Sequence, residues 1–561
     1  MKRILSLSKY LYISIVILLS ACSDFLKEEA LDFKSTDNSF VTSSDFDKSV
    51  NNLFWLVRSE FYSASEQQTF DYIFGTDLIY DGAIQGAQRF NDFDNTCNPS
   101  NTYLNSHWTN LYKIVAEANT VIARLSTASI SDEEKKIYEA KAKFFRAFAY
   151  RTLTYLYGGV PIELDEVAIP KKDYVRAPKE DVLEQAIEDL KFASNNLPEI
   201  TAIKDGEISK SAAFHLLSEV YLANKQYKEA YDAASEVIKN PNLKLMAERF
   251  GSLKSEPGDV YYDLFRVNNQ NRGSGNTEAI WVIQYETNTI GGDNGTSNVY
   301  GSGYKLERII APLVRDLYID GEKTSPFIWP ASTLSSGGRG VGFAIPTKYF
   351  SNTIWENSDW NDMRNSNYNF VRQFKSDNPK SKFYGQVLDT ENPPTGVTVP
   401  TREWFPYQSK CTTPGQHPET VYANIGTLLL SGNAGFTYAD QYLFRLAETY
   451  LLRAEAALGM NDKKLAKEDI NVVRTRANAT PCTEDDIDIN YILDERMREL
   501  GIEEKRRLTL GRLGLVYQRT VEVAHNPLVR NMEVKHNLWP IPYAEIERNT
   551  DATLEQNPGY N

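Results

Sequence analysis

Residues 442–478 read YLFRLAETYLLRAEAALGMNDKKLAKEDINVVRTRAN, and their pattern predicts two helices joined by a short turn. In the first half, apolar residues recur at the i, i+3, i+4 and i+7 spacing of one helix face, namely Leu443, Leu446, Ala447, Tyr450, Leu451, Ala454 and Leu458. Gly459 predicts the end of this helix, because glycine adopts a positive φ at little cost. The second half predicts another helix, with apolar or small residues at Leu465, Ala466, Ile470 and Val473.

An earlier stretch repeats this hairpin. Residues 209–241 read SKSAAFHLLSEVYLANKQYKEAYDAASEVIKNP, and the separation from Ser218 to Ala230 equals that from Ala454 to Ala466. These are the small-residue positions of a tetratricopeptide hairpin. Because one such hairpin cannot bury its apolar face alone, the two predict a stacked array. Residues 242–439 separate them as a long insertion.

Further helices are predicted before and after this insertion. The apolar pattern indicates helices at 108–125, 132–157, 179–195 and 492–511, and one starting at Asp45 with Ser43 or Ser44 as its N-cap. The helix at 132–157 stops at GGVPI, a strong terminator. We interpret the many Glu and Arg residues of 492–511 as solvated i,i+4 pairs.

Composition excludes several classes of function. The chain has 561 residues and a formal net charge of −14, which argues against general nucleic-acid binding, since phosphate contacts need clustered Lys and Arg. Four Cys form no CxxC pair and five His are scattered, so we expect no zinc site, disulfide framework or other cofactor. The NDFDN piece lacks the Gly and distal Glu of an EF-hand, which favours a solvated turn.

The N-terminus predicts export and a lipid anchor. Residues 1–21 have a basic start and a short apolar run, as in a secretory signal peptide. They end in LSAC, which is similar to a bacterial lipobox with Cys22 as the lipidated residue, and residues 22–44 are then a tether. The alternative is an ordinary signal peptide with an incidental Cys.

Two regions lack helical periodicity. Residues 70–106 mix Asp, Asn, Arg and Tyr with Gly and Pro, and a polar loop this long in a compact chain is usually functional or disordered. The insertion carries five Trp, a β-like segment at 279–285 and the glycine-rich runs GGDNGTSNVYGSG and SSGGRG. Neither run has the GxxxxGK[ST] form of a phosphate loop, so flexible surface loops are predicted.

Several stretches in chain order resemble one family, the SusD/RagB-type outer-membrane lipoproteins of Bacteroidetes. They are the lipobox at Cys22, AKFFRAFAYRTLTYLYGGVPI, SAAFHLLSEVYLANKQYKEA, ETYLLRAEAALG with INVVRTRA, ILDERMREL, LWPIPYAEIERN and QNPGY. One departure is GRLG at 511–514, where many members have an aromatic-rich stretch. The resemblance covers essentially the whole chain.

This resemblance implies a mainly α-helical scaffold of about four tetratricopeptide units, with a loop-rich insertion containing short strands packed against it. The organisation expected is an N-terminal helical repeat region at 45–241, the insertion at 242–439 and a C-terminal helical region with an extended tail at 440–561. It also implies a lipoprotein on the outer face of the outer membrane. There it would cap a SusC-like TonB-dependent transporter and capture glycans or other nutrients.

A glycan site needs aromatic platforms for flat sugar faces and polar groups at the rim. The 70–103 loop offers Asp77, Tyr80, Asp81, Arg89 and Asn91, and the insertion offers Tyr300, Tyr304, Trp329, Trp355 and Trp360. Trp329, between Pro326 and Pro330, is the first choice. A Trp in a β-like run, such as Trp281, is more often core.

Catalysis is not expected from the sequence. A glycosidase needs two facing carboxylates, and 75 acidic residues identify no pair. A nucleophilic triad needs a positioned His, and none of the five His has motif context. The alternatives to glycan binding are a lipoprotein that only docks on and stabilises the transporter, and one that binds peptides.

Overall fold

The computed structural model describes residues 40–560, apart from 64, 67, 84–88, 168, 288, 290–302 and 357–358. Helices dominate it. The longer ones are α2 (Ser43–Phe61), α4 (Thr102–Arg124), α5 (Asp132–Tyr157), α6 (Lys179–Asn196), α7 (Lys210–Ala223), α8 (Tyr227–Ile238), α12 (Leu446–Gly459), α13 (Lys463–Arg476) and α14 (Ile489–Glu499). The shorter ones are α3 (Phe93–Thr96), α9 (Val260–Asp263), α10 (Leu306–Ile310), α11 (Lys348–Ser351), α15 (Arg506–Leu513) and α16 (Tyr543–Arg548).

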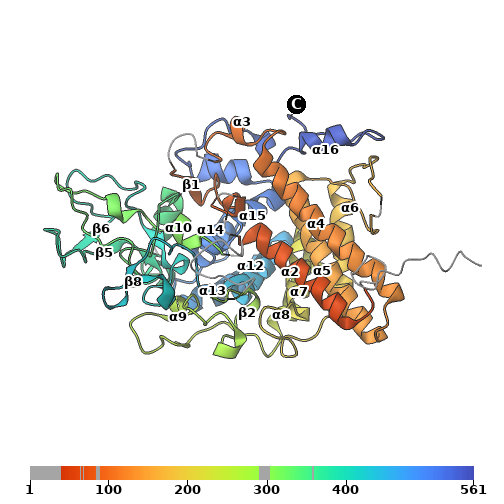
Figure 1. Ribbon diagram of the computed structural model, residues 1–561, viewed down its shortest axis with the longest axis horizontal. Coiled ribbons are helices and arrows are strands. Elements are labelled where there is room, and N and C mark those ends of the chain that lie inside the picture. Colours follow the sequence, from red (N-terminus) through yellow and green to blue (C-terminus); the bar gives the residue numbers. More distant parts are fainter. Residues whose placement is uncertain are drawn as a thin grey trace, which may run out of the picture.

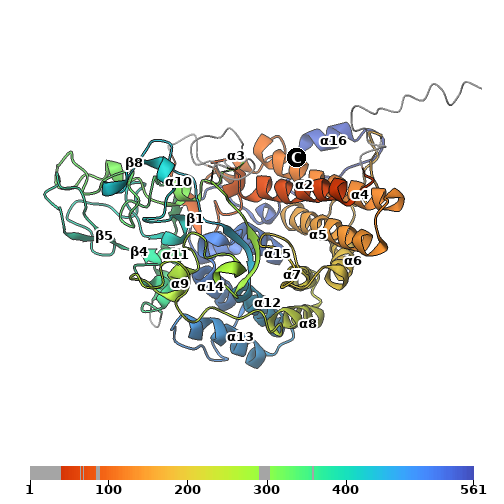
Figure 2. The ribbon, with the colours of Figure 1, turned by 60° about the horizontal axis from the view of Figure 1, so that its bottom comes forward.

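The long helices stack in pairs. α2 packs on α4, α5 on α6, α7 on α8 and α12 on α13, and neighbouring pairs meet through α4 and α5, α6 and α7, and α8 and α12. Figures 1 and 2 show this array running from α4, α5 and α6 near one end of the molecule to α12 and α13 in its middle. The two hairpins of equal spacing are direct neighbours, since Leu222 and Ala230 pack on Leu452 and Ala456. The prediction of a mainly helical repeat scaffold is therefore confirmed.

The predicted start of the first helix in residues 442–478 is wrong, whereas its predicted end at Gly459 is confirmed, although not for the expected reason. Gln441–Arg445 forms strand β10 instead of the first helical turn, because it pairs antiparallel with β2 (Ala279–Ile283). Gly459 is the last residue of α12 and lacks a positive φ. A side chain there would place its Cβ 2.3 Å from the ring of Tyr227. Glycine at this position therefore lets α12 approach α8 closely.

Local side-chain chemistry accounts for the helix boundaries. The N-cap of α2 is Thr42, not Ser43 or Ser44, and its N–H and hydroxyl both donate to the Asp45 carboxylate, at 3.2 and 2.9 Å. Asn101 caps α4 by accepting the Tyr103 N–H at 2.9 Å, so this helix starts earlier than predicted. The predicted helix at 132–157 is confirmed as α5. The predicted single helix at 492–511 is instead α14 and α15, separated at Gly501.

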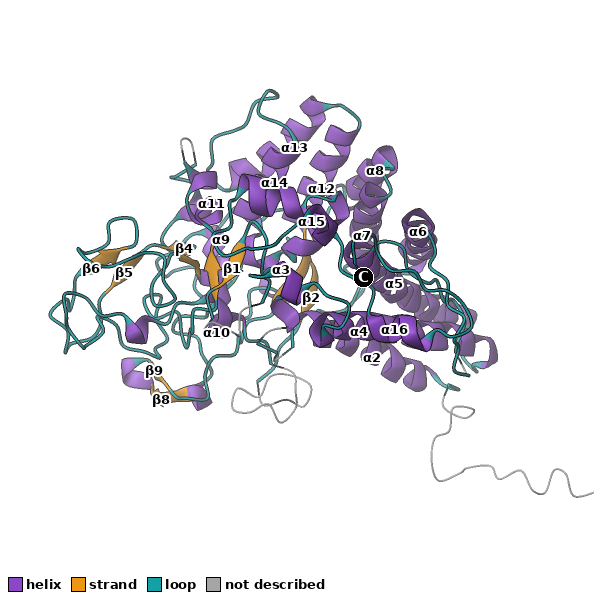
Figure 3. Cartoon of the chain, turned by 90° about the horizontal axis from the view of Figure 1, so that it is seen from above, coloured by secondary structure: helices purple, strands orange, loops and turns teal. Residues whose placement is uncertain are grey.

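The strands are short and form five two-stranded antiparallel sheets within the described residues. The pairs are β1 (Ile79–Asp81) with β3 (Ala344–Pro346), β2 with β10, β4 (Phe370–Val371) with β7 (Tyr407–Gln408), β5 (Gln373–Lys375) with β6 (Val387–Asp389), and β8 (Tyr422–Asn424) with β9 (Leu429–Leu430). Figure 3 shows most of them scattered among loops at the end of the molecule away from the repeats.

Trp281 of β2 joins the insertion to the helical array. Its side chain is 1% exposed, and its ring centroid lies 5.4 Å from Phe144, 5.8 Å from Phe148 and 5.5 Å from Phe444. Edge-to-face contacts of this kind add to the hydrophobic gain of burial. The prediction that Trp281 belongs to the core is confirmed.

One hydrophobic core runs through both ends of the molecule. It includes Phe145 and Leu216 of the repeats and Ile309, Phe327 and Trp404 of the insertion. The insertion is thus packed against the scaffold as part of one continuous core. Among the described helices, none has both the length and the apolar character needed to cross a bilayer.

Candidate functional site

The long polar loop and the insertion meet at one short sheet. β1 and β3 pair antiparallel, with Tyr80 opposite Ile345 and Asp81 opposite Ala344. Beyond the sheet, the Gly82 N–H donates to the Phe343 carbonyl at 2.7 Å. The two regions from which the sequence suggests ligand-binding residues are therefore adjacent.

Two further segments are held against residues 339–343, one by backbone hydrogen bonds and the other by the Arg402 side chain. The Val341 N–H donates to the Arg308 carbonyl at 2.8 Å, and the Gly342 N–H to the Ala311 carbonyl at 2.8 Å. The Arg402 Nε donates to the Val341 carbonyl at 2.7 Å. Arg308 and Arg402 are thereby fixed beside the segment that begins at Arg339.

The run SSGGRG, residues 335–340, forms a tight turn around a buried carboxylate. Gly337 and Gly338 have φ of +63° and +73°. A Cβ on Gly338 would lie 2.1 Å from the carboxyl carbon of Glu307, whose Oε1 accepts the Arg339 N–H at 2.9 Å. The prediction of a flexible surface loop is wrong here, because these glycines are buried and are needed to wrap the chain around Glu307. The other glycine-rich run lies largely outside the described residues.

Glu307 is itself held by a buried polar chain. Its Oε2 accepts the Thr412 hydroxyl at 2.7 Å and lies 2.8 Å from His417 Nε2, while His417 Nδ1 lies 2.6 Å from the Ser332 hydroxyl. This set contains the residue types of a hydrolase triad. Ser332 is 1% exposed, however, and its Oγ accepts the Gly415 N–H at 2.8 Å. A nucleophile needs access to a substrate carbon, so the geometry supports a structural role for this chain.

Trp329 lies above this turn and is partly exposed. Its indole N–H donates to the Gly340 carbonyl at 2.9 Å, which fixes the ring. The guanidinium carbons of Arg315 and Arg339 lie 4.8 and 5.8 Å from the ring centroid. At exposed sites such cation–π contacts are worth about 0.5–1 kcal/mol each. They are weak enough for a ligand to replace.

A second aromatic side chain and another guanidinium extend this surface. The Arg402 guanidinium carbon lies 4.7 Å from the ring centroid of Phe343, which is also partly exposed. We call this set the arginine–tryptophan surface, and it consists of Trp329, Phe343, Arg308, Arg315, Arg339 and Arg402.

The guanidiniums of this surface influence one another. Burial, followed by repulsion from Arg308, lowers the pKa of Arg339. Burial also lowers the pKa of Arg402, and Arg308 and Arg315 add to that effect against the attraction of Glu403 and Asp316. Arg308 pairs with Glu66 at 2.8 Å and Arg315 with Asp316 at 2.9 Å. Within the described part of the chain, no carboxylate lies in ion-pair distance of the Arg339 or Arg402 guanidinium.

Several candidates from the 70–103 loop are engaged inside the protein. Asp77 is 0% exposed and receives hydrogen bonds from Arg506 at 2.8 and 2.6 Å and from Arg519 at 2.9 Å. Burial alone would raise the pKa of Asp77, but these two arginines hold it below its ordinary value. The structure thus places Asp77 as an anchor for the C-terminal helices.

Asp81, Arg89 and Asn91 are also buried. Asp81 accepts the N–H groups of Ala83 and Arg89 at 2.8 and 2.9 Å, and Asn91 donates to the Asp81 carbonyl at 2.8 Å. Arg89 pairs with Asp71. These contacts join residues 81–83 to residues 89–91, and the side chains do not face solvent.

Three aromatic candidates lie in the core. Tyr80 and Tyr304 are 7% and 2% exposed, and Tyr304 stacks on Phe70 with ring centroids 5.5 Å apart. Trp355 is 0% exposed and donates its indole N–H to the Phe350 carbonyl at 2.9 Å. None of the three is positioned as a surface platform. Tyr300, like Cys22, lies outside the described residues.

Trp360 is the most exposed of the candidates, at 42%. The Arg372 guanidinium carbon lies 4.9 Å from its ring centroid, and its carbonyl accepts the Asn365 amide at 2.9 Å. Another exposed tryptophan, Trp55 on α2, lines a groove of about 640 Å³ with Arg58, Lys204 and Gln284. Both offer aromatic surface away from the arginine–tryptophan surface.

Comparison with known proteins decides the family. Residues 265–560 match the family model described as "SusD family", and residues 29–222 match one described as "Starch-binding associating with outer membrane". The chain belongs to the SusD family. "SusD-like protein P25" of Formosa agariphila is 23% identical over 98% of each chain. Among solved structures, "Laminarin binding SusD-like protein" superposes with a TM-score of 0.67 at 21% identity, over 93% of this chain and 100% of that one.

A shorter match has higher identity. "Starch-binding protein SusD" of Bacteroides thetaiotaomicron is 34% identical over 131 residues, which is 23% of each chain. The recognition of this SusD family member from its ordered stretches is therefore confirmed.

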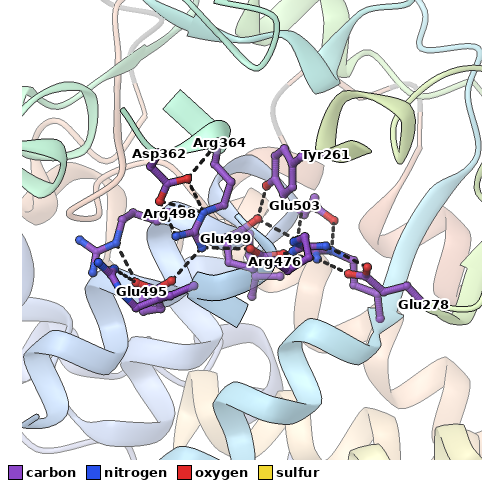
Figure 4. Close-up of polar contacts among 12 residues, drawn as sticks. Tyr261, Glu278, Asp362, Arg364, Arg476, Glu495, Arg498, Glu499 and Glu503 are labelled. Atoms are coloured by element: carbon purple, nitrogen blue, oxygen red, sulfur yellow. Dashed lines mark hydrogen bonds and ion pairs between the residues drawn. The ribbon is translucent and has the colours of Figure 1, made fainter. Parts of the chain in front are cut away.

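In this SusD family chain the charged residues of α14 and α15 are buried, so the interpretation as solvated i,i+4 pairs is wrong. Glu499 is 0% exposed and accepts hydrogen bonds from Arg364 of the insertion at 3.0 Å and Arg445 of β10 at 2.5 Å, and also from Arg476 of α13. Figure 4 shows the network that extends from these contacts to Glu278 and Glu495. Burial alone would raise the pKa of Glu499, but the three arginines hold it well below its usual range.

Sequence reasoning missed most of the arginine–tryptophan surface in this SusD family member. It identified Trp329 but not Phe343 or the four arginines, because they come from four segments with no common spacing. One signal was available: the glycines of SSGGRG sit directly beside Arg339. Adjacent glycines that require positive φ indicate a built turn, and a built turn fixes the residue that follows it.

Proposed function

We propose that this protein is a cell-surface lipoprotein that binds a glycan through the arginine–tryptophan surface. The observation that supports the proposal is the partly exposed indole of Trp329, whose N–H is held by the Gly340 carbonyl and whose ring lies near the guanidiniums of Arg315 and Arg339. Relatives within the family support it, since one is named as laminarin-binding and another as starch-binding. Aromatic rings suit the apolar faces of sugars, and guanidiniums donate hydrogen bonds to their oxygens.

The proposed cellular setting follows from the sequence and the family. Cys22 carries the lipid, and the protein sits on the outer membrane facing the exterior. The tether is the stretch between Cys22 and α2, shorter than the expected 22–44, because α2 begins at Ser43 with Thr42 as its N-cap. Delivery of the glycan to a SusC-like TonB-dependent transporter completes the proposal. Support comes from the lipobox and from the description of one matching family model as associating with the outer membrane.

The proposed role is binding without catalysis. The Ser332, His417 and Glu307 chain supports the turn that carries Arg339, and its serine is closed to solvent. Incubation of the purified protein with polysaccharides, followed by analysis of released sugars, tests this part. Turnover that depends on Ser332 would overturn it.

The binding proposal is tested on the purified, folded chain. A glycan array followed by calorimetric titration should identify a ligand. Trp329→Ala should weaken it by about tenfold or more, because central aromatic anchors carry most of the binding energy. Trp360→Ala serves as the matched control and should leave the affinity unchanged. Binding that survives Trp329→Ala would contradict the site, and no binding to any glycan or peptide would favour a protein that only docks on the transporter.

A further inference from the structure

The arginine–tryptophan surface concentrates positive charge on an acidic protein. The whole chain carries −14, whereas three arginines lie over two partly exposed rings and Arg308 lies near enough to repel two of them. Two of them, Arg308 and Arg315, have carboxylate partners in Glu66 and Asp316. Glu403 lies near Arg402 without a described ion pair, and Glu307 is buried beneath the turn. Arg339 and Arg402 thus direct their guanidiniums at aromatic rings.

The positions of these guanidiniums disfavour a neutral sugar. Arg315 and Arg339 already lie over the Trp329 ring, at 4.8 and 5.8 Å. A neutral sugar that stacks there must displace a cation from the ring and gives it no opposite charge in return. An anionic sugar gives each displaced guanidinium a charged acceptor, and arginine forms bidentate hydrogen bonds with planar or tetrahedral oxyanions.

The turn around Glu307 argues that this arrangement is built. The Arg339 N–H is held by Glu307 Oε1 at 2.9 Å, and Gly338 cannot carry a side chain without meeting the same carboxylate. The Arg402 Nε is tied to the Val341 carbonyl at 2.7 Å. The backbone of Arg339 and the Nε of Arg402 are therefore held in place, and both side chains are partly exposed. Preorganised donors lose little freedom when an anion binds.

We propose that the ligand of this surface is an anionic polysaccharide, whose carboxylate or sulfate groups are bound by Arg339 and Arg402 while a sugar ring packs against Trp329 or Phe343. This inference rests on the proposed glycan-binding function and names the class of glycan.

The test compares matched charged and neutral polymers with the purified chain. One arm uses polygalacturonate and its methyl-esterified form, a second uses a sulfated galactan and its desulfated form, and neutral laminarin is the reference. Titration at low and high salt should show that a charged form binds about tenfold or more tightly than its neutral counterpart, and that salt weakens it. The two arms separate a carboxylate ligand from a sulfate ligand.

Arginine variants connect the effect to the surface. Arg339→Gln and Arg402→Gln should each lower the affinity for the charged polymer about tenfold. Arg339→Gln should leave thermal unfolding unchanged, because its guanidinium has no described ion pair to lose, whereas Arg402→Gln also removes the hydrogen bond to the Val341 carbonyl and should lower the unfolding temperature slightly. Arg548→Gln, whose side chain is 75% exposed at a remote site, is the matched control and should have no effect.

Three results of these titrations would contradict one or both proposals. The neutral polymers could bind as tightly as the charged ones or more tightly, with an affinity that Trp329→Ala abolishes and Arg339→Gln does not change. That result would exclude an anionic ligand and leave the proposed glycan-binding function standing. If neither arginine variant changes the affinity for the charged polymer, the arginine–tryptophan surface is not the site that binds it. Failure to bind any polymer of either charge would overturn both proposals.

Discussion

At the scale of single residues, the most informative group is the buried histidine His107, for which the sequence alone predicts no role. His107 of α4 is 0% exposed, contacts the Glu60 carboxylate through Nδ1 and lies 3.0 Å from Asp71 Oδ2 through Nε2. Asp71 in turn pairs with Arg89. Burial alone would lower the pKa of His107, but the two carboxylates raise it to about 9.

This raised pKa predicts a specific pH dependence of stability. The folded-state pKa of about 9 lies above the ordinary value of 6.5, so the stabilisation is fully present below pH 6.5 and is lost as pH rises through 9. His107→Gln should lower the free energy of unfolding by about 3 kcal/mol at pH 6 and by clearly less at pH 9.5. Urea denaturation at both pH values measures the difference.

The exposed His525 provides the control for this experiment. His525→Gln should change the free energy of unfolding by less than about 0.5 kcal/mol at either pH, as expected for a surface position. A cost of His107→Gln that stays the same from pH 6 to pH 9.5 would show that the His107 side chain stabilises the fold without its charge.

At the scale of elements, two glycines allow neighbouring segments to pack closely, and the apolar periodicity of the sequence does not predict this packing. Gly459 lets α12 approach Tyr227 of α8, and Gly338 lets the 335–340 turn wrap around Glu307. The sequence predicted the helices on either side of Gly459 and the presence of a loop at SSGGRG. It could not predict which residues these glycines contact. Tyr227 and Glu307 lie in other segments of the chain, and only the fold brings them next to Gly459 and Gly338.

The turn around Glu307 supports a matched pair of substitutions. Gly338→Ala should destabilise the protein by about 2 kcal/mol more than Gly396→Ala, since both positions have positive φ but only Gly338 faces a neighbour. Thermal and urea unfolding provide the comparison. Because Arg339 follows directly, Gly338→Ala should also weaken glycan binding, whereas Gly396→Ala should not. Equal stability losses in the two variants would mean that the turn relaxes around the added methyl group.

At the scale of the whole molecule, a buried ionic network joins the insertion to the repeats. Glu499 of α14 accepts hydrogen bonds from arginines in the insertion, β10 and α13. Glu278, directly before β2, accepts from two of them, Arg445 at 2.8 Å and Arg476 at 3.0 Å. Replacing a whole buried network with apolar residues is often neutral for stability, but removing one charge leaves its partners buried and unpaired.

Glu499→Gln should therefore be costly. We expect the free energy of unfolding to fall by about 3 kcal/mol or more, with increased proteolysis of the insertion relative to the repeats. Glu547→Gln, at an exposed position on α16, is the control and should change stability by less than about 0.5 kcal/mol. A cost below about 1 kcal/mol for Glu499→Gln would contradict the coupling of the two parts through this network.

The limits of prediction also differ with scale. Helix existence, the split repeat and the family came from spacing and ordered stretches, because local apolar periodicity determines them. The burial of Asp77, Tyr304 and Trp355 could not be predicted. These residues lie in stretches without a repeating apolar pattern, so nothing in the sequence indicates whether a side chain faces the core or the solvent. Trp329 is partly exposed, so it stays a ligand-binding prediction, but its arginine neighbours could be found only from the fold.

Glycan protection in hydroxyl-radical footprinting tests the central claim, that the ligand binds at the arginine–tryptophan surface, most directly. The purified chain is footprinted with and without a glycan that binds in titration. With the glycan bound, oxidation should fall at Trp329 and Phe343 and should stay unchanged at Trp55 and Trp360. Protection of Trp360, or of the groove beside Trp55, with Trp329 unaffected would contradict it.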